Sequence, residues 1–212
     1  MKLLSRAVGP IATNVYVVGD EASHEAIAID TATPCVAWLT QQLASFGWTL
    51  KLIVSSHRHW DHIGDNAAVM EATGADLAAH TLDRYGLEAP QPLFAPFPIV
   101  PSVPAVDLAE GGIVRFGEIR LSVLHTPGHT EGSVCLLAGD EGLLLSGDTL
   151  FAGGWGRVDL PGGSVEAMIE SIDRLASLED HLRVLPGHGP ETTIGRERAW
   201  MSMVARERRL PS

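Results

Sequence analysis

Five histidines and two aspartates in four short segments are the residues whose types and spacing suggest chemistry. The densest segment is the motif H-x-H-x-D-H at residues 57–62, directly after an apolar run. In an extended loop, residues i and i+2 face the same way, so His57 and His59 reach one point while Asp61 and His62 turn toward a neighbouring one. The spacing therefore indicates two adjacent metal positions, and it lacks the helical pattern of two histidines at i and i+4 around a glutamate.

Three further segments supply donors that this motif lacks. His129 lies in Pro-Gly-His-Thr, Asp148 in Ser-Gly-Asp-Thr and His188 in Pro-Gly-His-Gly, each shortly after an apolar run. Imidazole and carboxylate ligands suit Zn, Fe and Mn, and a carboxylate with two oxygens can bridge ions roughly 3.5–4 Å apart. We therefore expect one site built from seven residues: His57, His59, Asp61, His62, His129, Asp148 and His188.

The elements that must position these donors are short strands separated by helices. Runs rich in Val, Ile and Leu predict strands at residues 14–18, 25–29, 50–55, 75–79, 113–116, 119–124, 133–138, 143–146 and 182–185. Several of these runs follow one another through tight turns, as at residues 139–142, which disfavours a purely parallel sheet. We therefore predict an α/β protein with mixed sheets and outer helices.

Helical periodicity marks four segments between and after the strands. Thr33-Pro34 is typical of an N-cap followed by proline at the first helical position, and the apolar stripe after it ends at Gly47. The other predicted helices cover residues 64–73, 164–178 and 195–208, and the second of these begins at Ser164.

A proline-rich stretch covers residues 87–106. Leu93, Phe94, Phe97 and Ile99 are interleaved there with six prolines: Pro90, Pro92, Pro96, Pro98, Pro101 and Pro104. A loop of this length in a compact chain is usually functional or disordered, and its aromatic residues favour a docked flap or pocket wall over a plain linker. We expect residues 1–212 to form a single domain with this flap between its halves, since 212 residues suit one large domain or two small ones.

Composition and charge exclude several classes of function. With 45% hydrophobic and 19% charged residues, the chain has enough apolar material for a sizeable core, which excludes intrinsic disorder. The 15 Lys and Arg against 26 Asp and Glu give a formal charge of -11, so nucleic acid is not expected as a partner. No apolar run approaches the ~18 residues that cross a bilayer, and the N-terminus lacks the apolar core of a signal peptide.

Cysteine usage agrees with a reduced compartment. Cys35 and Cys135 stand far apart in the chain without a C-x-x-C motif, which is typical of an intracellular protein rather than a bridged secreted one. We therefore expect a cytoplasmic protein with a small-molecule substrate and no membrane partner. The sequence leaves open whether the chain is a monomer or a homodimer.

The motifs together resemble a known family, the metallo-β-lactamase-fold hydrolases, and within them the glyoxalase II-like (hydroxyacylglutathione hydrolase-like) proteins. The resemblance rests on H-x-H-x-D-H at 57–62, P-G-H-T at 127–130, G-D-T-L-F at 147–151, G-x-G-R-x-D at 154–159 and G-H-G at 187–189. It implies an αβ/βα sandwich of the metallo-β-lactamase type, two mixed sheets with outer helices, with the site along one edge.

The same resemblance implies how two divalent metal ions would be held, with Zn preferred and Fe or Mn possible. One set of ligands would be His57, His59 and His129, and the other Asp61, His62 and His188. Asp148 would bridge the two ions, and Asp30, at the end of an early strand, would orient the site from behind the ligands. Asp61, His62 and Asp148 are the candidate catalytic residues.

Departures from the family pattern concern the substrate. Arg157 occupies the position of a basic glutathione-binding residue, but Asp159 stands where glyoxalase II enzymes generally have an aromatic residue. Only about two dozen residues follow His188, so we expect much of the C-terminal glutathione cradle to be missing. Arg157 and Trp155 are the candidate substrate-binding residues. The bridging Asp148, which class B β-lactamases generally lack, makes antibiotic hydrolysis an unexpected main role.

The leading functional hypothesis is hydrolysis of a thioester or related activated acyl compound. A hydroxide bridging the two metals would attack the acyl carbonyl, because coordination lowers the pKa of bound water from ~15.7 to roughly 7. The alternatives are a persulfide dioxygenase with one iron at His57, His129 and Asp148, which the G-R-x-D form also resembles, and a lactonase or esterase of the same fold. A metal-binding scaffold without turnover is a third hypothesis.

Overall fold

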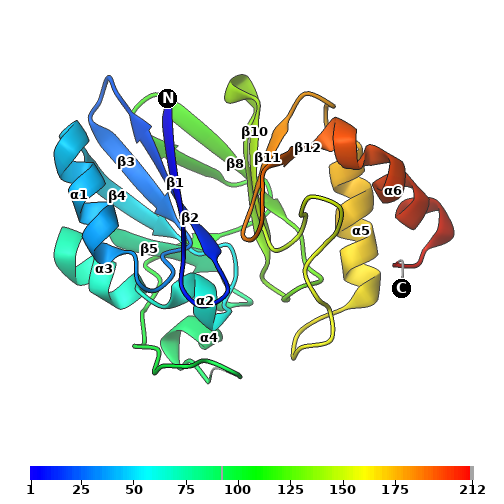
Figure 1. The fold of residues 1–212 in the computed structure, drawn as a ribbon, viewed down its shortest axis with the longest axis horizontal. Coiled ribbons are helices and arrows are strands. Elements are labelled where there is room, and N and C mark those ends of the chain that lie inside the picture. The colour runs from blue at the N-terminus through cyan, green and yellow to red at the C-terminus, as the bar shows by residue number, and fades with distance from the viewer. Residues whose placement is uncertain (92, 211–212) are drawn as a thin grey trace.

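Two β-sheets packed face to face, with helices on their outer sides, form the frame of the molecule (Figure 1). The structure is a computed structural model, and it describes residues 1–91 and 93–210. Each sheet has six strands within that part of the chain, and both sheets are mixed. The α/β sandwich implied by the resemblance is therefore confirmed.

The first sheet has the order β1-β2-β3-β4-β5-β6 and is built from the N-terminal half of the chain. Its strands are β1 (Lys2–Val8), β2 (Thr13–Asp20), β3 (Glu25–Ile29), β4 (Thr49–Val54), β5 (Asp76–His80) and β6 (Val106–Leu108). Strands β1 to β3 pair antiparallel, whereas β3 to β6 pair parallel. The parallel strands β3, β4 and β5 thus end at the same edge of the sheet.

The second sheet has the order β12-β11-β10-β9-β8-β7 and uses the C-terminal half. Its strands are β7 (Ile113–Phe116), β8 (Ile119–His125), β9 (Val134–Ala138), β10 (Leu143–Gly147), β11 (Arg183–Pro186) and β12 (Thr192–Thr193), and a 3-10 turn η1 (Gly139–Glu141) joins β9 to β10. Strands β10 and β11 pair parallel, so their ends also meet at one edge.

Helices cover the outer face of each sheet. Their bounds are α1 (Val36–Phe46), α2 (Trp60–Ile63), α3 (Asn66–Thr73), α4 (Arg84–Glu88), α5 (Val165–Ala176) and α6 (Ile194–Glu207). Helices α1 and α3 lie over the first sheet, and α5 and α6 over the second (Figure 1). Among the described residues, no helix combines the length and apolarity needed to span a bilayer.

The core has three layers because strands in the middle of each sheet are buried on both faces. In β3, Ile27 and Ile29 point between the two sheets, while Ala26 and Ala28 point toward α1 and α3. This is the alternation that the period-two geometry of a strand imposes. It also explains why the central strands are nearly continuous apolar runs, which made them easy to predict.

The start of helix α1 differs from the prediction. The N-cap is Cys35 rather than Thr33, and the helix begins at Val36 rather than at Pro34. The Asp65 carboxylate accepts hydrogen bonds from the backbone N–H of Cys35 (2.6 Å) and of Val36 (3.2 Å), so a residue 30 positions away caps the helix. By contrast, α5 begins as predicted, since the Ser164 hydroxyl accepts from the backbone N–H of Ala167.

The proline-rich stretch 87–106 packs onto the first half of the molecule. It begins in α4 and ends where β6 pairs with β5, and Pro92 lies outside the described residues. Ile99 is buried in the cluster beneath α1 and α3, and the ring of Phe97 meets that of Trp60 edge to face at 5.6 Å. The stretch is thus anchored next to α2, which carries part of the H-x-H-x-D-H motif.

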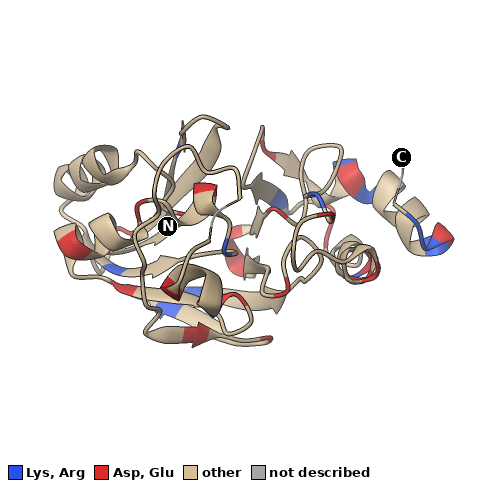
Figure 2. Cartoon of the chain, turned by 90° about the horizontal axis from the view of Figure 1, so that it is seen from below, with Lys and Arg blue, Asp and Glu red and all other residues tan. Residues whose placement is uncertain are grey.

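Charged side chains are spread over many elements, and acidic and basic residues alternate on α6 (Figure 2). Several arginines form ion pairs with carboxylates, among them Arg174 with Glu110 and Arg198 with Asp180. Because the chain has 26 acidic and 15 basic residues, acidic side chains remain in excess even where arginines pair with them.

Candidate metal centre

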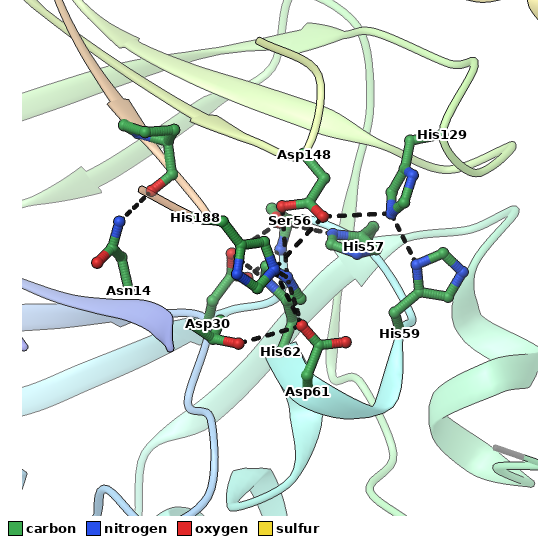
Figure 3. Close-up of polar contacts among 12 residues, drawn as sticks. Asn14, Asp30, Ser56, His57, His59, Asp61, His62, His129, Asp148 and His188 are labelled. Carbon is green, nitrogen blue, oxygen red and sulfur yellow. Dashed lines mark hydrogen bonds and ion pairs between the residues drawn. The ribbon is translucent and has the colours of Figure 1, made fainter. Parts of the chain in front are cut away.

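The predicted donors come together where the ends of strands from both sheets meet (Figure 3). His57 and His59 lie in the loop after β4, and Asp61 and His62 follow in the short helix α2. The other three donors lie just after β8, β10 and β11, and they are His129, Asp148 and His188. Four segments far apart in the sequence therefore supply one cluster, because each follows a strand that ends at this edge.

The first group of donors consists of His57, His59 and His129, whose ligand atoms all lie within 4.8 Å of one another. His59 Nδ1 and His129 Nε2 are only 2.7 Å apart. The other ring nitrogen of His129 donates a hydrogen bond to the carbonyl oxygen of Arg157 at 2.7 Å. In a neutral imidazole this leaves the lone pair on Nε2, where it points into the group.

The second group consists of Asp61, His62 and His188. The Asp61 Oδ2 atom lies 3.1 Å from Nε2 of both His62 and His188, and these two nitrogens are 3.2 Å apart. His188 Nδ1 donates to the carbonyl oxygen of Ile11 at 3.2 Å, which leaves its Nε2 free to bind a cation. Each group thus presents three donors to one point.

Asp148 stands between the two groups and faces both. Its Oδ1 lies 3.4 Å from His62 Nε2, and its Oδ2 lies 3.4 Å from His129 Nε2. The Oδ2 atom also lies 3.6 Å from His188 Nε2, so one oxygen faces the second group and the other faces both groups. This is the arrangement that a bridging ligand requires.

Two of the ligand atoms lack a hydrogen-bond partner among the described residues, and a divalent cation would satisfy them. His57 Nε2 and Asp148 Oδ1 are buried without a hydrogen-bond partner, which is costly unless another species satisfies them. In His129 and His188, Nδ1 carries the proton, so the lone pair of each ring is on Nε2 and points at other ligand atoms of the cluster. Nitrogen and carboxylate donors in this number are typical ligands of Zn, Fe and Mn.

Asp30, at the end of β3, fixes the orientation of a histidine in each group. Its carboxylate accepts hydrogen bonds from the Ser56 backbone N–H (2.7 Å), the Ser56 hydroxyl (2.8 Å) and His62 Nδ1 (2.9 Å). Because the Ser56 proton points at Asp30, the Ser56 oxygen accepts from His57 Nδ1 at 3.0 Å. Both His57 and His62 are thereby held in the tautomer whose Nε2 carries the lone pair.

The electrostatics of the cluster keep the first group ready for a cation. Burial, together with the neighbouring imidazoles, lowers the pKa of His57 well below its usual value and that of His59 to about 3. Burial alone would raise the pKa of Asp61, but the adjacent His62 and His188 imidazoles lower it overall. His57 and His59 are therefore neutral and Asp61 is ionised at neutral pH, which are the states that bind metal. Burial lowers the pKa of His62 and His188, but the neighbouring carboxylates raise it overall, so a cation competes with protons in the second group.

We expect Asp30→Asn to weaken metal binding by about 10–100-fold, the usual effect of removing an outer partner of a histidine ligand. An amide in place of the carboxylate cannot accept all three hydrogen bonds without turning an N–H toward Ser56 or His62. Competition with a colorimetric chelator measures the affinity. Asp76→Asn, at an exposed position of β5, is the matched control, and equal affinities of the two variants would contradict this role of Asp30.

Two glycines make room for the ligands. A Cβ at Gly187 would overlap Asp148 Oδ1 and approach His62 Cε1 to 2.7 Å. A Cβ at Gly156 would overlap the Asp148 carbonyl oxygen and lie 2.9 Å from His129 Nδ1. The G-H-G and G-x-G-R segments therefore need glycine because ligand side chains pack directly against their backbone.

We expect Gly187→Ala to lower the affinity for the second cation at least as much as Asp30→Asn does, because the new methyl group displaces Asp148 and His62. Gly154→Ala is the control, since no atom lies within 4 Å of a Cβ built there. Bound metal per chain after gel filtration is the measurement. Two ions retained by both variants would show that the close contact at Gly187 has no such consequence.

Three polar residues that position ligands escaped sequence analysis. Ser56 joins Asp30 to His57, and the Thr13 hydroxyl donates to Asp61 Oδ2 at 3.1 Å. Asp83 is fully buried and accepts hydrogen bonds from the Arg58 backbone N–H (2.9 Å) and the Thr130 hydroxyl (2.7 Å). In the sequence, Arg58 lies between the ligands His57 and His59, and Thr130 follows the ligand His129. Their partners lie 25 to 48 residues away, apart from His57, so no local spacing reveals them. Of the three, only Ser56 lies next to a ligand in the sequence.

A cavity of about 930 Å³ opens directly onto the donors, and the two predicted substrate-binding residues differ in their relation to it. Arg157 lines the cavity, with its guanidinium paired to the Asp159 carboxylate at 2.7 Å. Trp155 is not among the residues that line it. Its ring instead lies 5.5 Å from that of Trp200, in the cluster beneath α5 and α6.

Comparison with known proteins places these features in a family context. The sequence model of the Metallo-beta-lactamase superfamily matches residues 8–188. An uncharacterized protein of Aquifex aeolicus is 39% identical over 91% of this chain and 92% of its own length. The hydroxyacylglutathione hydrolase of Maricaulis maris is 32% identical, and the match covers 82% of this chain but only 60% of that enzyme.

Three solved structures share the architecture. The BLEG-1 B3 metallo-beta-lactamase has a TM-score of 0.87 at 33% identity, covering 93% of this chain and 97% of its own. ETHE1 from Myxococcus xanthus has a TM-score of 0.80 at 28% identity, covering 100% and 92%. TTHA1623, solved in a di-iron-bound form, has a TM-score of 0.76 at 32% identity, covering 92% and 96%.

Proposed function

The chain belongs to the metallo-beta-lactamase superfamily, and from this membership and the donor geometry we propose that it is a binuclear metal-dependent hydrolase of a thioester or related activated acyl compound. The matches to hydroxyacylglutathione hydrolases support a hydrolase in general. The acyl substrate and the use of two ions are the proposal.

The observation that carries the proposal is the position of Asp148. Its two oxygens lie at the same distance, 3.4 Å, from one histidine nitrogen of each group. A site for one ion would not need a carboxylate that faces two complete sets of donors. The di-iron form of TTHA1623 supports two ions in a relative of similar size.

Cations held by these residues would lower the pKa of a bound water to roughly 7 and polarise the carbonyl of the substrate. The residues of the chain set the conditions for that chemistry. Asp61 and Asp148 offset half the charge of two divalent ions, so the pocket stays positive and attracts a developing oxyanion. The cavity gives a substrate access to His59, Asp61 and Asp148 from one side.

A persulfide dioxygenase is the second candidate, favoured by the G-R-x-D form at residues 156–159. In that case a single iron would use His57, His129 and Asp148 and leave His59 without a role. The 2.7 Å approach of His59 Nδ1 to His129 Nε2 favours the hydrolase, because it places His59 among the donors of the first group.

A substrate panel tests the proposal. The metal-loaded protein should hydrolyse thioesters such as S-lactoylglutathione, or related esters and lactones, without consuming oxygen. Oxygen uptake with glutathione persulfide, together with one iron per chain and no hydrolysis, would favour the second candidate instead. Full metal occupancy with neither activity would overturn both and indicate a scaffold.

A further inference from the structure

The cavity above the metal centre has walls of a distinct chemistry. Five of the metal donors line it, and most of its other side chains are apolar, among them Ile11, Trp60, Tyr85, Leu93, Phe94 and Phe151. At about 930 Å³ it lies at the upper end of the ~300–1,000 Å³ range of small-molecule sites. Its size therefore exceeds what a small acyl group such as lactoyl needs.

The two arginines in the cavity wall already have partners. Arg58 is buried, forms an ion pair with Asp83, donates to the Pro161 carbonyl oxygen and stacks 4.9 Å from the Tyr85 ring. The Arg157 guanidinium binds both carboxylate oxygens of Asp159 at 2.7 Å. To bind a carboxylate of an anionic substrate such as a glutathione conjugate, either guanidinium would have to give up its ion pair with an aspartate.

Three large side chains that line the cavity are more than half exposed to solvent. Phe94 is 80% exposed, Tyr85 56% and Leu93 52%, although other aromatics of the same stretch, such as Phe97, pack against the core. Exposed apolar side chains gathered beside a reactive site are typical of a surface that a ligand covers. The flap thus presents Leu93 and Phe94 to the cavity, while Phe97 and Ile99 anchor it to the core.

We propose that the substrate is an ester or thioester that carries an extended apolar chain, and that the flap residues Leu93 and Phe94 hold this chain. The inference rests on the proposed function. In the reaction, the oxygen of water adds to the acyl carbon and the C–S or C–O bond breaks. The products are a carboxylate and a thiol or alcohol. Of the two protons of the water, one is released to the solvent and the other goes to the sulfur or oxygen of the leaving thiol or alcohol.

Two substrate series test the inference with the metal-loaded protein. One series lengthens the acyl group from acetyl to decanoyl on a constant thiol, and the other lengthens the leaving alcohol or thiol on a constant acetyl group. We expect kcat/KM to rise about two- to fourfold per methylene in one series, because each buried methylene adds to binding of the transition state. The series that responds identifies which part of the substrate the flap holds.

Inhibition by product analogues, which are alkanoates and alcohols, measures the affinity of the cavity for an apolar chain independently of how fast any one substrate is hydrolysed. If the flap holds the acyl chain, octanoate should inhibit at least tenfold more strongly than acetate. If it holds the leaving group, 1-octanol should do so relative to ethanol. Equal inhibition within both pairs would overturn the inference.

Matched variants locate the effect. Leu93→Ser and Phe94→Ser should each flatten the dependence on chain length, whereas Ile113→Ser, on β7 and 52% exposed outside the cavity, should leave it unchanged. Hydrolysis that is flat with chain length in both series would overturn the inference while leaving the proposed function intact. No hydrolysis at any length, by a protein with full metal occupancy, would overturn the proposed function itself.

Discussion

Asp148→Asn is expected to lower kcat/KM for acyl hydrolysis by about a thousandfold, since a metal centre contributes several kcal/mol to transition-state stabilisation and each 1.36 kcal/mol is a factor of ten. The substitution keeps the shape of the side chain but removes its charge. It also places an amide N–H toward either His129 Nε2 or His62 Nε2, each now 3.4 Å from a carboxylate oxygen. At least one cation should therefore be lost or displaced.

Asp140→Asn, in the exposed turn η1, is the control for this variant because it removes the same charge far from the donors. Steady-state kinetics should be combined with elemental analysis and circular dichroism, so that loss of metal is separated from loss of fold. A folded Asp148→Asn protein that hydrolyses a thioester at a rate within tenfold of the wild type would contradict the bridging role.

Removing the metals is expected to abolish hydrolysis and to lower the melting temperature. A ligand present at a hundred times its Kd stabilises the folded state by about 2.7 kcal/mol, and for a chain of this size that corresponds to a shift of roughly 5–10 °C. Without cations, His57 Nε2 and Asp148 Oδ1 remain buried without partners, and the carboxylates of Asp61 and Asp148 lie in one cluster. The apo-protein should therefore be active again only after Zn, Fe or Mn is returned.

The control for metal removal is the same chelator already saturated with metal, which should change neither activity nor melting temperature. Differential scanning calorimetry and a thioester assay on the same samples make the comparison. Unchanged hydrolysis after complete removal of metal, verified by elemental analysis, would exclude the metal-dependent mechanism.

The ligands could be predicted from the sequence because they lie in compact motifs. The motif at residues 57–62 places four donors within six residues, and His129, Asp148 and His188 each follow a strand beside glycine. Ser56, Thr13 and Asp83 could not be found in this way, since each acts through a hydrogen bond to a partner placed by tertiary structure. The orientation of Trp155 also depends on packing, in this case against Trp200 on α6.

The fold was predictable where the strands are buried on both faces. Strand β1 was not predicted because it is an edge strand in which three of seven residues, Ser5, Arg6 and Ala7, are exposed and break the apolar pattern. Strand β6 escaped because it begins at the end of the proline-rich stretch and has only three residues. The cap of α1 was placed wrongly because Asp65, which accepts its first N–H groups, is distant in sequence.

The central claim is that two complete sets of donors hold two cations in one site. Native mass spectrometry of the apo-protein titrated with Zn measures this directly, because each bound ion adds its own mass to the chain. We predict two ions per wild-type chain, and one ion per chain in both the His59→Ala and the His188→Ala variants. A wild-type chain that takes up only one ion at saturation would contradict the account.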